Sequence, residues 1–380
     1  MAIKVIQWAT GTVGGLQLQQ IIQRPDLELV GVFCFSESKT GVDAGDLCGL
    51  PKTGIEATAS KEEIYAMEAD VVLHAASKAH GAHTNEEDII NLLASGKNVI
   101  TTTSYNHLPS YGEGLKQQFE EACKHGNSSF YAAGENPGFM LERLTATVTG
   151  ICRQIDSITF DEFVMCADHP VREMVVDLMG FAKKPEEVTV DNPIFKVLTR
   201  AYEQALNGLA DGLGIQYDKI VPTIEVDTLE HDIEIACGPV PAGTISGQCL
   251  TWTGYWNDKP FATIREIWLL TKDTSRWGVS ELTNYKSKDY YRLNIQGLPE
   301  VVMEMGIDIP ADAPAELQDV KAATYIMISN TGVAAIPEVV NADVGVLIPR
   351  IFGVYRPDCS DVNVLRDREK DCQKVGHIRE

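Results

Sequence analysis

The first 22 residues carry the feature that most constrains the fold. An apolar run at residues 3–8 leads into a glycine-containing turn at residues 9–15, and apolar side chains then recur at helical spacing through residues 16–22. This order predicts a strand, a tight turn and a helix. A glycine in such a turn lets the backbone approach a bound group, while the helix N-terminus presents unpaired N–H groups and a partial positive charge. The segment therefore predicts a site for an anionic ligand.

The turn matches the dinucleotide fingerprint, with alanine in place of glycine at its first position. The fingerprint residues are Ala9, Thr10, Gly11, Thr12, Val13 and Gly14. A second apolar run at residues 29–35 follows at the interval that a βαβ unit requires. Together the turn and the spacing predict that these residues bind the pyrophosphate of a dinucleotide.

Residues 1–145 alternate between short apolar runs and amphipathic stretches. The runs at 70–76, 98–102 and 129–133 predict further strands of a Rossmann-like sheet. Helices are expected from a capping box at Ser60, from about Thr84 to Gly96, and from about Tyr111 to His125. We therefore expect an α/β fold with an N-terminal parallel-sheet domain, rejoined by residues 325–380 after a helix over 319–336.

Residues 146–324 show a different pattern. The run at 244–252 alternates apolar and polar side chains, and a second run at 261–270 follows a turn at Asn257 and Asp258. Alternation with a period of two is typical of an antiparallel sheet with one solvated face. The sequence predicts a second, α+β domain with a mainly antiparallel sheet.

The composition of the chain limits the classes of molecule that it is expected to bind. The 380 residues carry a net charge of -22, which disfavours nucleic acid and anionic membrane surfaces. No stretch approaches the roughly 20 apolar residues of a spanning helix, and no signal-peptide pattern opens the chain. The nine cysteines are scattered without a CxxC pair, so we expect no metal site, no disulfide framework and a cytoplasmic location.

Segments that follow the later strands predict the remaining cofactor contacts. After the second strand, the hydroxyls of Ser36 and Ser38 and the ammonium of Lys39 favour the extra phosphate of NADP, while Glu37 keeps NAD possible. His74, near the carboxyl end of the third of these strands, is expected to be a half-buried structural histidine in preference to a catalytic one. The contacts predicted at the other strand ends are Ala75, Ala76, Ser77, Thr102, Asn136 and Pro137.

Three segments resemble a known family. They are Ala-Thr-Gly-Thr-Val-Gly at 9–14, Asn-Pro-Gly-Phe at 136–139 and Ala-Ala-Ile-Pro at 334–337. They look like the dihydrodipicolinate-reductase-like group that contains 2,4-diaminopentanoate dehydrogenase and the native amine dehydrogenases. The resemblance implies a homodimeric NAD(P)-dependent oxidoreductase, with the cofactor across the Rossmann edge and a small-molecule substrate between the domains. The second domain is accordingly expected to bind substrate and to dimerise.

The chain departs from this family in the loop before Pro109. Amine dehydrogenases of the group carry a glutamate there, whereas this chain has Ser104 and Tyr105. Tyr105 and Glu135 are the available substitutes as proton donors; the alternatives are an aromatic pocket wall for Tyr105 and an exposed loop acid for Glu135. The predicted substrate contacts are Asn106, His107, Phe139, Phe163, His169, Trp252 and Trp256.

Hydride transfer requires alignment of the reacting carbon and a proton source, and it needs no covalent chemistry from the protein. The missing glutamate therefore leaves the reaction type intact and favours an alcohol/ketone pair over an amine. We expect an oxidoreductase acting on a C=O or C=N carbon of a small, partly apolar substrate. A non-catalytic NAD(P)-binding or redox-sensing protein stays open as the alternative.

Overall fold

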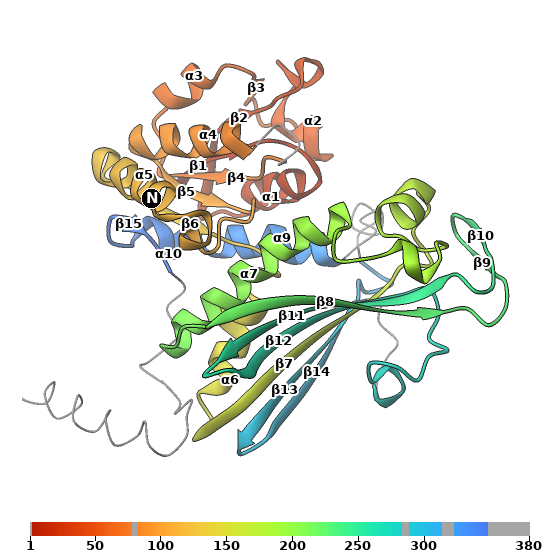
Figure 1. Cartoon of the computed structure of the whole chain (residues 1–380). Coiled ribbons are helices and arrows are strands. Elements are labelled where there is room, and N and C mark those ends of the chain that lie inside the picture. Colours follow the sequence, from red (N-terminus) through yellow and green to blue (C-terminus); the bar gives the residue numbers. More distant parts are fainter. Residues whose placement is uncertain (1, 78–81, 283–288, 314–322, 349–380) are drawn as a thin grey trace, which may run out of the picture. The chain divides into compact units, whose positions relative to one another are not determined.

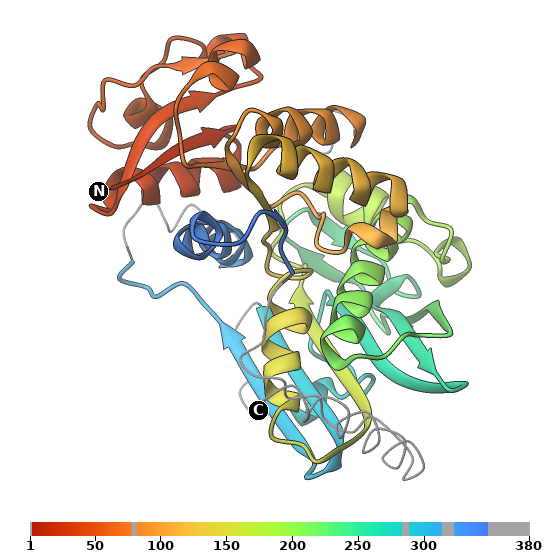
Figure 2. The same ribbon diagram turned by 90° about the vertical axis from the view of Figure 1, so that its left-hand side faces the viewer.

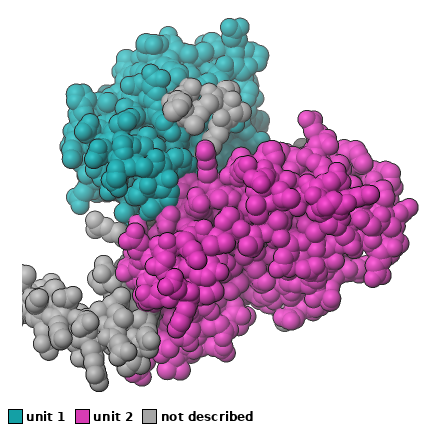
Figure 3. All heavy atoms as spheres, in the orientation of Figure 1, with its two compact units in different colours: residues 1–140, 309–349 teal, residues 141–308, 350–380 magenta. Residues whose placement is uncertain are grey.

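The computed structural model describes residues 2–77, 82–282, 289–313 and 323–348. The chain divides into two compact units, each with its own sheet (Figures 1 and 3). Unit 1 comprises residues 1–140 and 309–349, and unit 2 comprises residues 141–308 and 350–380. The tail from residue 349 onward, which the sequence assigns to the first domain, lies outside the described residues.

Unit 1 contains a seven-stranded sheet in the order β15-β6-β5-β4-β1-β2-β3. Its strands are β1 (Ile3–Trp8), β2 (Leu27–Phe33), β3 (Ala57–Thr58), β4 (Val71–His74), β5 (Asn98–Thr101), β6 (Ser129–Ala132) and β15 (Gly345–Val346). Every pairing in this sheet is parallel. The order of the first six strands is that of a Rossmann sheet, so the predicted class of the N-terminal domain is confirmed.

Helices cover both faces of this sheet. Their bounds are α1 (Thr12–Gln23), α2 (Ala44–Cys48), α3 (Lys61–Ala66), α4 (Ala82–Ala94), α5 (Glu113–Gly126), α9 (Ala323–Ala334) and α10 (Ile336–Val340). Apolar side chains of α3, α4 and α5 form the core on one face, and those of α1, α9 and α10 form it on the other. Figures 1 and 2 show α9 (blue) beside α1 (red), where Gln20 Nε2 donates to Ser329 Oγ at 3.3 Å. The late segment thus completes the sheet's second face.

Local signals explain where the helices begin and end. The side chain of Ser60 accepts a hydrogen bond from the backbone N–H of Glu63 at 3.2 Å and so caps α3 as predicted. The helix expected from Tyr111 starts two residues later, because Gly112 has a φ of 98° and separates α5 from a short 3-10 turn. Asn127, with a φ of 53°, ends α5 in the left-handed conformation.

Unit 2 contains a six-stranded, mostly antiparallel sheet in the order β14-β13-β7-β12-β11-β8. Its strands are β7 (Gln154–Met165), β8 (Lys219–Thr228), β11 (Ile245–Trp256), β12 (Lys259–Leu269), β13 (Asp289–Leu298) and β14 (Val301–Ile307), with a separate pair β9 (Ile233–Ile235) and β10 (Gly238–Val240). Only β7 and β12 run parallel to each other among these pairings. The predicted hairpin through Asn257 and Asp258 is confirmed, since both residues adopt positive φ between β11 and β12.

One long helix, α7 (Pro193–Leu213), packs on β11 and β12 of this sheet, and the short α6 (Ala146–Thr149) contacts α7 (Figure 1). The contact centres on Trp252, whose ring lies 5.0 Å from Phe195 and 4.6 Å from Tyr202 between ring centroids. The indole Nε1 donates to Thr199 Oγ1 at 2.9 Å. The large buried aromatic ring and its satisfied N–H fix the helix against the sheet.

Candidate active site

The fingerprint turn lies at the carboxyl end of β1, at the point where the strand order of unit 1 reverses. The chain passes from β1 to β2 on one side, and β4 pairs with β1 on the other. The backbone N–H of Ala75 donates to the carbonyl of Trp8 at 3.0 Å and continues this pairing past the strand end. Ligands of open α/β sheets bind at this reversal point.

Ala9 adopts the backbone conformation that glycine serves in the usual fingerprint. Its φ is 73°, which costs an L-residue about 1 kcal/mol or more. Its N–H donates to the carbonyl of Phe33 at 2.9 Å, and its carbonyl accepts from Gln7 Nε2 at 3.0 Å. Gln7 Nε2 also lies 3.2 Å from Gln17 Oε1, and both glutamines are fully buried. These hydrogen bonds offset the strain of placing alanine there.

The two glycines of the turn serve different purposes. A Cβ on Gly14 would lie 2.1 Å from the carbonyl oxygen of Ala9, so α1 can approach β1 only with glycine at this position. A Cβ on Gly11 would meet no atom within 4 Å. Among the described residues no side chain caps α1, and its first turn holds no acid. The turn therefore offers open backbone N–H groups to an anion.

The turn after β2 reaches the fingerprint through Lys39. The Nζ of Lys39 donates to the carbonyl of Thr10 at 2.7 Å and lies 3.2 Å from its hydroxyl. The hydroxyls of Ser36 and Ser38 lie 2.7 Å apart and are exposed together with Glu37. The predicted phosphate residues of these two turns are thus brought together.

His74 joins the carboxyl ends of β4 and β5. The side chain is fully buried, and its Nδ1 lies 3.0 Å from Thr101 Oγ1 and 3.5 Å from Thr103 Oγ1. Thr103 Oγ1 donates to the carbonyl of Ala76 at 2.9 Å. Burial lowers the pKa of His74 to about 3, so the ring is neutral at physiological pH. His74 holds the turn after β4 and the loop after β5 in register, in line with its predicted structural role.

The loops after β5 and β6 also meet. Asn106 Nδ2 donates to the carbonyl of Ala132 at 3.2 Å. A Cβ on Gly138, which has a φ of 127°, would lie 2.9 Å from the same amide nitrogen. Asn106 therefore packs directly on the loop that contains Glu135, whose backbone carbonyl accepts from the N–H groups of Phe139 and Met140, each at 3.0 Å.

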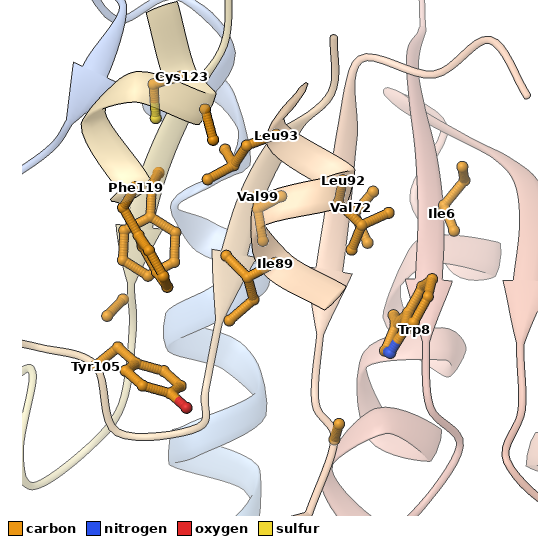
Figure 4. Close-up of a cluster of buried hydrophobic side chains, with 14 of the residues drawn as sticks. Ile6, Trp8, Val72, Ile89, Leu92, Leu93, Val99, Tyr105, Phe119 and Cys123 are labelled. Carbon is orange, nitrogen blue, oxygen red and sulfur yellow. The ribbon is translucent and has the colours of Figure 1, made fainter. Parts of the chain in front are cut away.

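The two candidate proton donors have different surroundings. Tyr105 lies in the apolar core near Phe119 (Figure 4). Its ring centroid is 6.0 Å from that of Phe119 and 5.2 Å from that of Tyr111. Burial raises the pKa of its hydroxyl well above the usual range. Glu135 lies in the loop after β6 and is 4% exposed, so it is a buried acid and not the exposed loop acid of the alternative interpretation. His107 lies on the neighbouring loop, with Nδ1 2.7 Å from Ser110 Oγ.

The structure separates the substrate contacts predicted in unit 2. In the register of the sheet, Phe163 pairs with Ile267, whereas Trp252 pairs with Ile264. Alternation along β12 places these pairs on opposite faces, so Phe163 and Trp252 do not share a surface. Trp256 packs on Phe261 near the hairpin end at 5.5 Å between ring centroids, and His169 Nδ1 accepts from the N–H of Val171 at 3.2 Å beyond β7.

The residues predicted from the sequence do not include several buried polar side chains inside strands. Gln7 holds the fingerprint turn, and Glu266 accepts hydrogen bonds from Tyr202 Oη and Trp268 Nε1 beneath α7. Asp161 receives bidentate bonds of 2.6 Å from Arg265 and further bonds from Arg292. The sequence signal for these residues is a polar residue inside an apolar strand, which requires a buried partner.

Within the described ranges, no group of three or more potential ligand residues is arranged to hold a metal ion. None of the described helices is long and apolar enough to span a membrane.

The chain is similar in sequence to two dehydrogenases of known function. No protein-family model matches the chain. It is 26% identical over 249 residues to an amine dehydrogenase of Streptomyces virginiae, covering 64% of this chain and 68% of that protein. It is 23% identical over 267 residues to 2,4-diaminopentanoate dehydrogenase of Acetoanaerobium sticklandii, covering 67% and 72% respectively.

Among solved structures, amine dehydrogenase from Mycobacterium smegmatis has the same fold. The two chains superpose with a TM-score of 0.65 at 15% identity, covering 94% of this chain and 98% of the other. The resemblance stated from the sequence motifs is thereby confirmed. In sequence and fold, this chain is similar to amine dehydrogenases, and in sequence also to 2,4-diaminopentanoate dehydrogenase.

Proposed function

We propose that this protein is an NAD(P)-dependent oxidoreductase that moves a hydride to or from the C=O or C=N carbon of a small, partly apolar substrate. The observation that carries the proposal is the open fingerprint turn at the reversal point of the sheet, where Gly11 leaves space and the N-terminus of α1 has no side-chain cap among the described residues. Both curated relatives are dehydrogenases, which supports an enzyme.

The residues of the turn fit a dinucleotide. Residues 9–14 would hold the pyrophosphate through backbone N–H groups, and Ser36, Ser38 and Lys39 supply donors that favour the additional phosphate of NADP. When bound, the nicotinamide supplies the hydride donor or acceptor. Ala75, Ala76, Ser77 and Thr102, with Asn136 and Pro137 after β6, lie at the same sheet edge and complete the proposed contacts.

We assign the proton transfer to Glu135 in preference to Tyr105. The raised pKa of the buried Tyr105 hydroxyl makes it a weak acid near neutral pH, and its ring belongs to the apolar core. Glu135 lies in a tight loop at the ligand-binding edge, packed against Asn106 through Gly138. A carboxyl group there takes the place of the loop glutamate that this chain lacks.

Unit 2 is proposed to bind the substrate and to form a homodimer. The support is the similarity to the amine dehydrogenase group, for which the sequence resemblance implies this arrangement. Sedimentation or light scattering of the full chain tests the dimer, and a monomer at micromolar concentration would refute it.

Two matched variants test the cofactor site. Gly11→Val should abolish the rise in melting temperature that NADPH produces, because its side chain occupies the space at the turn, where an added Cβ meets no atom within 4 Å. Gly114→Val also adds a side chain in open space, but at the start of α5, and should keep the full shift. An undiminished shift in Gly11→Val would refute the site.

A turnover screen separates the enzyme from the non-catalytic alternative. NADPH consumption is followed with aldehydes, ketones and cyclic imines, with and without ammonia. Once a substrate is found, Glu135→Gln should lower kcat by about 10²-fold to 10⁴-fold, while Tyr105→Phe stays near wild type. Cofactor binding without turnover on any of these compounds would instead favour a redox-sensing or structural protein.

A further inference from the structure

Lys39 connects two turns that follow different strands. It lies in the turn after β2, yet its Nζ donates to the carbonyl oxygen of Thr10 at 2.7 Å in the turn after β1, with the Thr10 hydroxyl 3.2 Å away. Lys39 is half-buried, whereas Ser36 and Ser38 are exposed and bonded to each other. The lysine therefore contacts the turn after β1, whereas the two serines contact each other.

The contact with Thr10 controls the orientation of the next backbone N–H. The carbonyl of Thr10 and the N–H of Gly11 belong to one planar, trans peptide unit and point in opposite directions. An ammonium that holds the carbonyl on one side thus directs the Gly11 N–H to the other. Gly11 is the fingerprint position where the added Cβ would find open space.

Other groups hold the two peptide units that flank the strained residue Ala9. Ala9 has a φ of 73°, its N–H donates to the carbonyl of Phe33, and its carbonyl accepts from Gln7 Nε2. The peptide unit between Thr10 and Gly11 is the next one along the chain, and Lys39 holds it through a charge-assisted hydrogen bond. Both acceptors on Thr10 are neutral, so this contact does not itself neutralise the positive charge of Lys39.

We propose that Lys39 is a positioning residue for the pyrophosphate turn and supports the binding of NADH and NADPH alike. This inference rests on the proposed function and changes one of its expectations: Lys39 is more than a contact to the 2′-phosphate that distinguishes NADP from NAD. Its remaining N–H is available for that phosphate as an additional role.

The test compares three ligands on variants of the full chain. Lys39→Met keeps the aliphatic stem and removes the charge and the donors. We expect it to raise the Kd for NADH, for NADPH and for ADP-ribose by about tenfold or more. ADP-ribose is the decisive probe, because it contains the pyrophosphate but neither the 2′-phosphate nor the nicotinamide. Lys39→Arg should restore much of the affinity for all three ligands, which a general loss of packing would not explain.

Two further variants make the result interpretable. Lys4→Met is a matched control, since Lys4 lies at the opposite end of β1 and pairs with Glu68; it should leave all three Kd values unchanged. Ser38→Ala should affect NADPH alone. If Lys39→Met is poorly folded by circular dichroism, Lys39→Gln takes its place in the same comparison.

Each outcome decides between roles for Lys39. A loss confined to NADPH, or no loss at all, would overturn the positioning role while leaving the proposed function intact. Failure of the wild-type chain to bind any of the three ligands would overturn the proposed function and this inference with it.

Discussion

The sheets of the two units bury polar groups in different places. In unit 1 the strands are covered on both faces by apolar side chains, and the buried polar side chains lie at or near strand ends. Gln7, His74 and Thr101 lie at or next to the carboxyl ends of their strands, and Ser129 begins β6. In unit 2 the charged residues Asp161 and Glu266 are buried well inside strands.

This difference follows from how each sheet is covered. A parallel sheet between two layers of helices leaves no water for groups in mid-strand, so polar residues are tolerated where loops begin. The sheet of unit 2 has α7 on one face and partly exposed threonines such as Thr251 and Thr263 on the other, and its guanidinium groups reach solvent at their edges. The buried polar residues inside the strands of unit 2 therefore need side-chain partners within the sheet.

The largest expected loss of stability comes from removing the charge of Asp161 in unit 2, which lies between two arginines. Asp161 is 2% exposed and binds two arginines, so Asp161→Asn should lower the free energy of unfolding by about 3 to 5 kcal/mol. Asp88 of unit 1 provides the matched control. It is equally buried, but among the described residues its ion pair is with the partly exposed Lys61, and burial raises its pKa.

Because the ionised form of Asp88 is disfavoured by burial, Asp88→Asn should change the free energy of unfolding far less than Asp161→Asn. Urea unfolding at pH 7 measures both variants. Equal losses of unfolding free energy in the two variants would contradict the expected difference between Asp161 and Asp88.

The next effect is the pH dependence that His74 gives to unit 1. The folded pKa of about 3 lies below the ordinary value of 6.5, so between these values the unfolded chain binds one proton more than the folded chain. Stability from this group is fully present above pH 6.5 and is lost as the pH falls toward 3. From pH 7 to pH 5 the loss should be about 2 kcal/mol.

His74→Gln isolates this contribution, since glutamine does not titrate. The variant is expected to be less stable at pH 7 but to lose less stability on acidification than the wild type. Parallel curves of unfolding free energy against pH for the two proteins would show that His74 is not buried as a neutral ring.

The smallest effect concerns the aromatic core of unit 2. Thr199→Val keeps the shape of the side chain but removes the acceptor for Trp252 Nε1, so the free energy of unfolding should fall by about 1 kcal/mol. Once a substrate is known, its KM should not change, because Trp252 packs between α7 and the sheet. A raised KM with normal stability would instead favour the substrate role predicted for Trp252.

Most of unit 1 could be predicted because its signals are local in the sequence. Short apolar runs separated by helix-length stretches indicate a parallel sheet, and chain order then predicts which loops share an edge. The turn at Ala9 to Gly14 and the turn at Ser36 to Lys39 were identified in this way. The two-residue strands β3 and β15 are not predicted, because two residues carry no detectable periodicity.

In unit 2 the sequence predicts a hairpin but not which strand residues share a face of the sheet. The hairpin at Asn257 was predicted because turn residues and alternating runs are adjacent in the chain. The placement of Phe163 and Trp252 on opposite faces depends on the register between β7, β12 and β11, which joins residues about 90 positions apart. Alternation within one strand does not indicate the phase of another.

The sequence by itself was sufficient to determine the class of both sheets and the position of the glycine turn after β1, because these depend on periodicity and on glycine. Only the tertiary structure decided that Lys39 holds Thr10, that Gln7 secures Ala9 and that Tyr105 belongs to the core. These contacts join side chains from different strands and loops, and their distances arise from packing. Local patterns in a sequence cannot encode them.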